Sequence, residues 1–418
     1  YSCTVDFEKL NTSNIQVDPA DLPFAAQCTE PMTYCYPPQQ NMFQFWTNLT
    51  IDLYGGYFMT PNGNFTNGDM GENRGHSGGM YEIYYLHIFN NTRRIIAQCD
   101  ASGERGLSGV MRIVQAYGTL MTTDAYGPIP YSSILSGENE VYFEFDSQKD
   151  LYKAMLEDLS TAITDISAMG ADEIAKLKSF DCWCNGDKDL WVKIANTMKL
   201  RMALRLSKRE TEAGNAGMNL KAIATEAAQN TLATVNKDIL IDKSLENEMW
   251  LMFNWGDCGF NANLVTIMSG TKDPRQPLYM TLNTGDIKNE AGTTTVAANS
   301  QYQGIRFARG LPSKPNSWFI FFGWNQVNNG SSYTMPLPIM KAAEAYFLLA
   351  EAKLRWDIGS ESVKNLYENG IRVSMTNELA YRGAYAGIKE YPEGAVAAFI
   401  NGPSTKIDYT EPIKAELS

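Results

Sequence analysis

The stretch "YGTLMTTDAYGPIPYSS", residues 117–133, joins a helical pattern to an abrupt turn. Residues 107–123 have the apolar spacing of an amphipathic helix. The pattern is then broken by residues that turn the chain, because glycine permits positive φ and each proline removes a backbone donor. These residues are Asp124, Gly127, Pro128 and Pro130. The stretch therefore predicts a long helix that stops sharply.

Helical patterns dominate the rest of the chain. Residues 151–166, 191–206 and 338–355 place apolar side chains at steps of three and four, which predicts one apolar face on each helix. Weaker patterns predict helices at about 80–98 and 361–378. Small residues at the expected crossing points favour stacked helix-turn-helix units, although no clean repeat of about 34 residues is visible. The predicted fold class is mainly α.

One section differs in composition from these helices. Residues 211–334 are rich in Gly, Asn, Thr and Pro, and they show little helical periodicity after about residue 230. They predict long loops and short strands, with "GTTTVAANSQYQGIRF" (292–307) as the best hairpin candidate. Loops of this length inside a compact protein are usually functional surfaces.

The charge balance excludes some partners. The 418 residues include 35 Lys and Arg against 47 Asp and Glu, a net charge of −12, and contain no basic run. Nucleic acids and anionic membranes are bound mainly through clustered Lys and Arg, so we expect neither as a direct partner. Only two histidines occur; His76 is expected to be a solvated loop residue and His87 a packed helix residue.

No motif predicts a catalytic centre, a metal centre or a cofactor. The seven cysteines have irregular spacing, without the paired CxxC pattern of a zinc or redox site. Cys28 and Cys35 could close a small disulfide loop in an oxidising compartment. One oxygen-rich loop could wrap a calcium ion, although its spacing is not that of an EF-hand. Its side chains are Asn64, Asn67, Asp69 and Glu72.

Residues 117–133 resemble a signature of the SusD/RagB-like family, the nutrient-binding lipoproteins of the starch-utilisation-system D type. In that family a helix is followed by D-x-(Y/F)-G-(D/P)-(I/V)-P-Y. Four further motifs occur in the family's order and, with the first, cover most of the chain. They are "LYKAMLEDLSTAI" (151–163), "GDKDLWVKIANTMKLRMALRLS" (186–207), "KDPRQPLYM" (272–280) and "MPLPIMKAAEAYFLLAEAKLR" (335–355).

The resemblance implies a single SusD-like domain over residues 1–418. Four tetratricopeptide-like helix pairs would form a scaffold over about 32–210 and 335–418. An irregular, loop-rich region at about 211–334 would pack on one side and bind the ligand. The shared motifs themselves have structural roles; in "DPR", for example, Asp273 and Arg275 can form a turn with a local ion pair.

Aromatic residues beside amides are the candidate ligand-binding groups. Sugars pack their C–H faces on rings and need amide or carboxylate partners for their hydroxyls. "NSWFIFFGWNQ" (316–326) supplies this mixture, and we expect the Trp324 ring to be exposed, while Phe321 and Phe322 pack inward. The opposing hypothesis for this stretch is a buried strand, and for the Gly-Asn loop that holds Tyr57 it is an ordinary turn. The candidates are Trp324, Trp318, Asn325, Gln326, Trp255 and Tyr57.

The family start is similar to "SCTVDFEKLNT" (2–12), which makes Cys3 the candidate lipidated residue; the alternative is an ordinary free cysteine. The resemblance implies a lipid-anchored protein of the outer membrane, facing the exterior and without enzymatic activity. It would bind a glycan and deliver it to a SusC-like TonB-dependent transporter. Two alternatives stay open: a peptide-binding member of the same family, and a helical glycoside hydrolase that uses two carboxylates.

Overall fold

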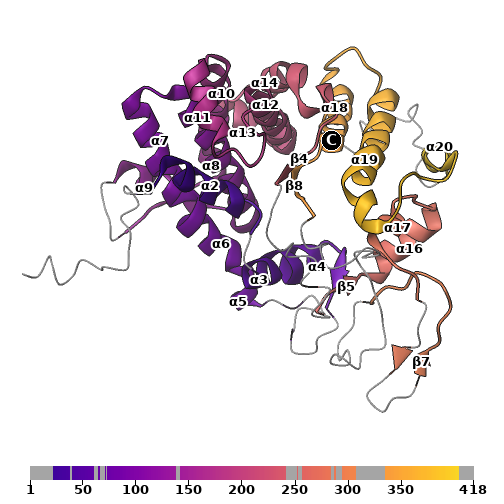
Figure 1. The fold of residues 1–418 in the computed structure, drawn as a ribbon. Coiled ribbons are helices and arrows are strands. Elements are labelled where there is room, and N and C mark those ends of the chain that lie inside the picture. Colours follow the sequence, from indigo (N-terminus) through magenta and orange to yellow (C-terminus); the bar gives the residue numbers. More distant parts are fainter. Residues whose placement is uncertain are drawn as a thin grey trace, which may run out of the picture.

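The computed structural model confirms a mainly α fold (Figure 1). Its strands are short, and each belongs to a two-stranded antiparallel sheet. None of the described helices combines the length and apolar character needed to cross a bilayer. The structure describes residues 22–37, 40–60, 65, 71, 73–137, 142–241, 252, 257–283, 287–288, 294–306 and 335–403.

The helical body is built from the first half of the chain. Its first elements are α2 (Phe24–Tyr34), α3 (Gln40–Met42), the π-helical segment η2 (Phe43–Ile51), α4 (Asp52–Tyr54), α5 (Arg74–Ser77), α6 (Gly79–Ile83), the π-helical segment η4 (Tyr84–Phe89) and α7 (Asn90–Ser102). They are followed by α8 (Arg105–Tyr126), α9 (Ser132–Ser136), α10 (Gln148–Ser167), α11 (Ala171–Lys178) and α12 (Lys188–Arg205). Short helical segments then follow: η5 (Leu206–Arg209), α13 (Glu210–Asn215), α14 (Leu220–Ala227), η6 (Ala228–Asn230) and η7 (Leu232–Thr234).

The predicted helices are confirmed, with caps that explain their ends. Ser147 and Asp187 accept hydrogen bonds from the first turns of α10 and α12. Helix α8 stops at Tyr126, where Gly127 takes a φ of 78° that other residues avoid. The sharp stop expected from residues 117–133 is therefore present.

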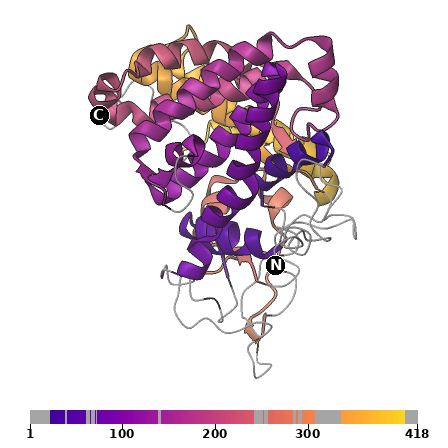
Figure 2. The same cartoon turned by 90° about the vertical axis from the view of Figure 1, so that its left-hand side faces the viewer.

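Consecutive helices pack side by side around one large apolar core. Helix α8 contacts both α7 and α10, and α10 contacts α12, so neighbouring helices form antiparallel layers (Figure 2). Close approach requires small residues; a Cβ on Gly118 would lie 2.8 Å from Ile88. The π-helical segment η4, which carries Ile88, is continuous with α6 and α7 and occupies the predicted helix at 80–98.

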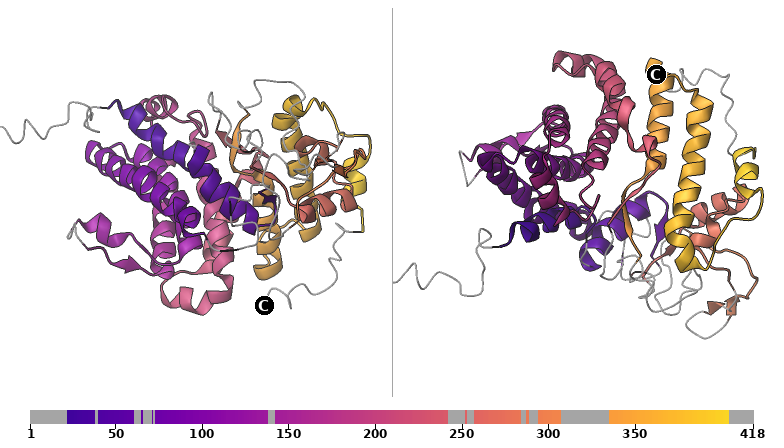
Figure 3. Two further views of the ribbon diagram at one scale, coloured as in Figure 1. Left: turned by 90° about the horizontal axis from the view of Figure 1, so that it is seen from below. Right: turned by 45° about the horizontal axis from the view of Figure 1, so that its top comes forward.

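A two-stranded sheet joins the helical body to the C-terminal helices. Strand β4 (Ile239–Ile241) pairs with β8 (Leu337–Met340), with Ile241 opposite Leu337 (Figure 1). After β8 come α18 (Ala342–Trp356), α19 (Val363–Ala386) and α20 (Ala395–Ile400); α18 and α19 run side by side (Figure 3). The predicted helix at 338–355 was thus placed too early, because pairing with β4 keeps its first residues extended.

Strands β5 (Gly259–Phe260) and β7 (Thr294–Val296) and helices α16 (Ala262–Thr271) and α17 (Gln276–Tyr279) lie at the lower side of Figure 1. Strand β1 (Phe58–Met59) pairs with β5, and β6 (Ile287–Lys288) pairs with β7, so the hairpin partner lies upstream of the predicted 292–307 stretch. Strand β2 (Ile129–Pro130) pairs with β3 (Phe145–Asp146) beside α9. The two helices, α16 and α17, occur where the composition indicated loops.

The hypothesis of a Cys28–Cys35 disulfide is wrong, since both thiols are free and buried. Cys28 lies in α2 and Cys35 is its C-cap residue, and seven residues of helix separate Cα atoms by about 10 Å, which exceeds the reach of a disulfide. Burial raises the pKa of both thiols.

The "DPR" turn has the predicted ion pair. Arg275 Nη2 lies 2.6 Å from Asp273 Oδ2, and Arg275 Nη1 donates to Ser374 Oγ at 2.8 Å, which ties α17 to α19. The motif therefore has the structural role expected from the sequence.

Candidate functional site

Most of the predicted ligand-binding residues lie outside the described residues. These are Trp324, Trp318, Asn325, Gln326 and Trp255, and the same holds for Cys3 and for Phe321 and Phe322. All four side chains of the calcium hypothesis, residues 64, 67, 69 and 72, are also outside. Of the predicted ligand-binding residues, Tyr57 is the one that the structure describes.

Tyr57 presents its ring to solvent on the turn between α4 and β1, with 55% of its surface exposed. The backbone holds it from both sides: its N–H donates to Asp52 O at 2.9 Å, and its carbonyl accepts from Asn261 N at 3.0 Å. The ring lies against Gly55, where a Cβ would come within 2.9 Å of Cδ2. Gly56 has a φ of 73°, which the turn requires.

Three separate chain segments are hydrogen-bonded together beside Tyr57. Phe58 pairs with Phe260 across β1 and β5, with ring centroids 5.2 Å apart. Ile305 N donates to Phe260 O and Ile305 O accepts from Ala262 N, both at 2.8 Å. We call the residues 52–59, 257–262 and 304–305 the Tyr57 corner.

The Tyr57 corner lies next in sequence to the segments that hold the other predicted ligand-binding residues. In sequence, Trp255 is two residues before Asp257, and residues 307–334, with Trp318 and Trp324, follow Arg306 directly. The three described segments of the corner are hydrogen-bonded to one another, so the points where the chain leaves and re-enters them lie together. No sequence pattern indicated that these points meet.

A second exposed tyrosine lies three residues before Tyr57, and sequence reasoning missed it. Tyr54 is 39% exposed, and its hydroxyl donates to Gly71 O at 3.0 Å. Together with Tyr57 it flanks the two glycines of "DLYGGY" (52–57), a pattern that could have identified both rings. Phe58, by contrast, is partly buried against Phe260.

His76 does not match its expected environment. It is buried in α5, with its ring stacked on Phe45 at 4.6 Å and the edge of Phe65 at 5.9 Å. Burial lowers the pKa of its imidazole. The expectation of a solvated loop histidine is wrong, because Asn73 caps a short helix here and the ring packs against Phe45 and Phe65. His87, expected to be packed, stacks on Tyr34 at 3.7 Å.

Polar groups lie under the Tyr57 corner. Gln44 Nε2 donates to Asp257 Oδ2 at 3.0 Å, and Asn48 Nδ2 donates to Cys258 Sγ at 2.9 Å. Gln44, Asn48 and Asp52 are four residues apart in the helical run "FQFWTNLTIDLY" (43–54), a polar spacing that sequence reasoning did not use. Within the described ranges, no group of three or more His, Cys, Asp or Glu side chains is arranged to hold a metal ion.

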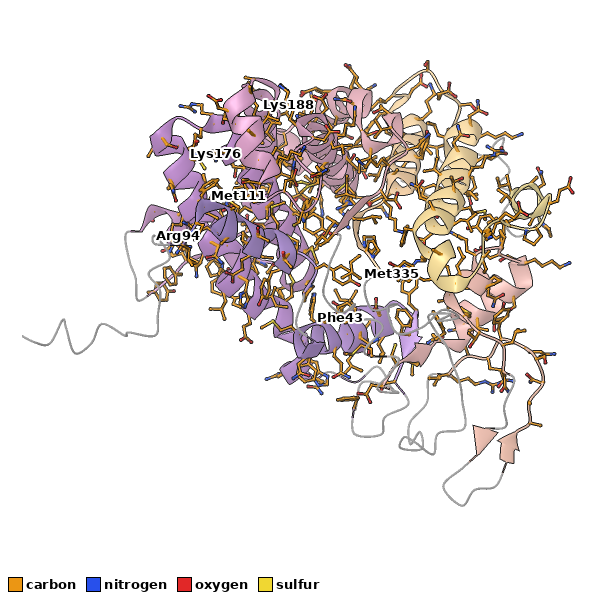
Figure 4. The ribbon with its side chains drawn as sticks, in the orientation of Figure 1. Phe43, Arg94, Met111, Lys176, Lys188 and Met335 are labelled. Atoms are coloured by element: carbon orange, nitrogen blue, oxygen red, sulfur yellow. The ribbon has the colours of Figure 1, made fainter. Side chains whose placement is uncertain are left out.

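A charged cluster stands where the chain re-enters the described part at Met335. Glu378 on α19 pairs with Lys341 and with Arg382, whose Nε lies 2.5 Å from Glu378 Oε2. Burial alone would raise the pKa of Glu378, but the two cations outweigh it and lower the pKa to about 2. Arg382 Nη1 also approaches Met335 Sδ at 3.9 Å; Met335 and Phe43 are labelled in Figure 4.

Two open grooves in the C-terminal half of the chain have linings that do not include Tyr57. One of about 660 Å³ follows α19, lined by small and aliphatic residues such as Ala380 and Gly383. The other, of about 480 Å³, lies between α16 and α20, with Phe399 as its one aromatic lining residue. Neither offers a flat ring platform comparable with Tyr54 and Tyr57.

One family model matches nearly the whole chain. The model of the SusD-like family, described as Susd and RagB outer membrane lipoprotein, matches residues 7–398, and the chain therefore belongs to this family. Its helix pairs are the tetratricopeptide-like scaffold of that family. No curated protein matches the chain.

Solved structures share the fold. A SusD-like protein from Bacteroides thetaiotaomicron is 24% identical, with a TM-score of 0.69, over 90% of this chain and 72% of that one. A chitin-binding SusD homologue from Flavobacterium johnsoniae is 22% identical, with a TM-score of 0.72 and the same coverage. A second Bacteroides thetaiotaomicron homologue is 21% identical, with a TM-score of 0.72, over 94% and 74%. At these identities the likeness establishes the fold alone.

Proposed function

We propose that this protein is a surface-exposed, lipid-anchored binding protein of the outer membrane that captures an oligosaccharide or polysaccharide. It delivers the glycan to a SusC-like TonB-dependent transporter, and Cys3 carries the lipid. One observation on the molecule carries the binding proposal: the exposed Tyr57 ring stands where three chain segments are hydrogen-bonded together. Membership of the SusD-like family and the likeness to the chitin-binding homologue from Flavobacterium johnsoniae support a glycan as the ligand.

The chemistry of the Tyr57 corner fits a sugar. More than half of the surface of Tyr57 is exposed, and sugar C–H groups pack on exposed aromatic rings. The amide-rich sequences next to the corner would supply partners for hydroxyl groups, with Trp324, Trp318, Asn325, Gln326 and Trp255 as the proposed contacts. The proposal involves no catalytic residue and no cofactor.

A binding screen by calorimetry, with chitin oligosaccharides, other glycans and peptides, tests the class of ligand. Saturable binding of a glycan supports the proposal. Binding of peptides without any glycan would replace it with the peptide-binding alternative. Incubation with the bound glycan followed by a reducing-end assay tests the hydrolase alternative; sustained turnover would overturn the proposal of binding without chemistry.

Paired variants test the location. Tyr57→Ala should weaken glycan binding by about 1–3 kcal/mol if the ring stacks on a sugar. Tyr142→Ala is the matched control, because Tyr142 is also an exposed tyrosine, with 69% of its surface accessible. It stands just before β3, which lies beside α9, on the side of the helical body opposite to the Tyr57 corner (Figure 1). Equal effects of the two variants would contradict the proposed site.

A further inference from the structure

Two buried oxygen atoms under the Tyr57 corner have no donor. Asn48 Oδ1 and Asp52 Oδ2 are shielded from solvent and lack a hydrogen-bond partner among the described residues. Asn48 as a whole is 2% exposed. A buried acceptor without a partner has lost its hydrogen bonds to water and gained none in return, so two of them at one place require an explanation.

The two side chains converge on one neighbour. They are four residues apart on the continuous helical run of η2 and α4, which puts them on the same side of the helix. Asn48 Nδ2 contacts Cys258 Sγ at 2.9 Å. Asp52 also faces this thiol: burial is the main cause that raises the pKa of Cys258, and the Asp52 carboxylate raises it further.

No described cation offsets a charge on Asp52. The titratable groups on the chain leading into β5 are Asp257 and Cys258, neither of which carries positive charge. Helix α5, which packs on η2, brings Arg74 and His76; the His76 ring is stacked on Phe45, and neither side chain contributes to the shift of the Asp52 pKa, which burial alone causes. Strand β1 and segment η2 contribute no titratable side chain, and α6 contributes Tyr81 and Glu82. Burial raises the pKa of Asp52 from its ordinary 3.8 to about 7.

We propose that Asn48 and Asp52 form a buried proton-binding pair: the Asp52 carboxyl is protonated and donates to Asn48 Oδ1, and loss of this proton loosens the turn that carries Tyr57. A single proton satisfies both unpartnered oxygens and removes the buried charge. The link to Tyr57 is a backbone contact, because Asp52 O accepts the Tyr57 N–H at 2.9 Å. An ionised carboxylate is drawn towards water, and Asp52 is the first residue of α4.

One rival arrangement keeps Asp52 ionised. If the Asn48 amide is rotated by half a turn, the Cys258 thiol donates to Asn48 Oδ1, and Asn48 Nδ2 donates to the Asp52 carboxylate. That arrangement also satisfies both oxygens, but it leaves a buried carboxylate with one neutral donor and no cation. The two arrangements predict opposite behaviour with pH.

The raised pKa of Asp52 determines whether folding stability rises or falls with pH. The folded protein holds a proton that the unfolded chain releases near pH 4, so the stabilisation is fully present below that pH and is lost as the pH rises through about 7. Over this window the folding equilibrium constant should fall about tenfold per pH unit. In the rival arrangement the stability would not fall over this window.

The test is denaturant unfolding of the full chain from pH 5 to 8, compared among wild type, Asp52→Asn and Asp257→Asn. We expect the wild type and Asp257→Asn to lose stability as pH rises, and Asp52→Asn to be flat. Infrared spectroscopy at pH 6 should show a protonated-carboxyl C=O band that disappears only in Asp52→Asn. A flat wild type, or a slope that survives in Asp52→Asn, would overturn the proposal.

A second arm measures binding, and it rests on the proposed function. Affinity for the glycan found in the screen should fall from pH 6 to pH 8 in the wild type and stay constant in Asp52→Asn. If no glycan binds, the proposed function fails while the unfolding result still decides on the proton. If a glycan binds with the same pH dependence in both proteins, the coupling to Tyr57 is contradicted.

Discussion

Two buried carboxyls, one in the C-terminal helices and one in the Tyr57 corner, face opposite electrostatic conditions. Glu378 on α19 is paired with Lys341 and Arg382 and accepts from the Tyr381 hydroxyl at 2.9 Å. Asp52 on α4 has no such cation among the described residues, and its Oδ2 has no partner. Burial disfavours the ionised form in both places.

This difference suits a structural role for the C-terminal helices and a binding role for the Tyr57 corner. In the scaffold, cations offset the cost of burying a charge, so Glu378 stays ionised and holds α19 to the start of α18 through Lys341. In the corner, polar groups are buried without full compensation, beside exposed tyrosines. A buried carboxyl without a compensating cation is more typical of a binding or reactive site than an ion-paired one, whose shifted pKa follows from the pairing. The comparison therefore favours the Tyr57 corner over the C-terminal helices as the place of function.

The largest expected effect is in the scaffold core. Trp191 is fully buried, stacks on Trp183 at 5.2 Å and donates to Asp181 Oδ2 at 2.9 Å. Trp191→Ala should lower the free energy of unfolding by about 3–5 kcal/mol, as measured by denaturant titration. Trp191→Phe, which keeps most of the apolar contact, should cost less; equal losses would show that the Asp181 contact dominates.

The next largest effect is the loss of folding stability at low pH, which depends on Glu378. The pKa of Glu378 is lowered to about 2, so its contribution is present above the unfolded value near 4.3 and is lost as the pH falls towards 2. The difference in stability between wild type and Glu378→Gln should shrink by about 3 kcal/mol between pH 5 and pH 2. A constant difference over that range would show that Glu378 is not held ionised by its cations.

A smaller effect is expected on ligand affinity. Trp324→Ala should weaken glycan binding by about 1–3 kcal/mol, with unchanged thermal stability, if its ring is exposed at the ligand. Phe321→Ala and Phe322→Ala should show the reverse pattern. Full affinity together with a large loss of stability in Trp324→Ala would place this ring in the core.

The smallest effect tests the Tyr57 turn. A methyl group at Gly55 would lie 2.9 Å from the Tyr57 ring and 3.1 Å from Ile51 O. Gly55→Ala should therefore displace the ring and cost about 1 kcal/mol of binding and of stability. Gly270→Ala is a control, because the same methyl there meets no atom within 4 Å. Identical behaviour of the two variants would show that the ring position is unimportant.

The helices could be predicted well from the sequence, and the site only in part. Spacing and caps identified α8, α10 and α12, because a helix face is a local pattern. Pairing of β8 with β4 depends on residues about one hundred positions apart, so the start of α18 was placed too early. Tyr57 was identified from its Gly-rich turn, whereas the contact of Ile305 with Phe260 has no local signal.

Locating the bound ligand tests the central claim most directly, through a crystal structure of the protein with the glycan that binds best in the calorimetric screen. We predict a sugar ring packed on the exposed face of Tyr57, in contact with residues from more than one of the three joined segments. A glycan found instead in the groove along α19, or at Tyr142 beside α9, with the Tyr57 corner empty, would contradict this prediction.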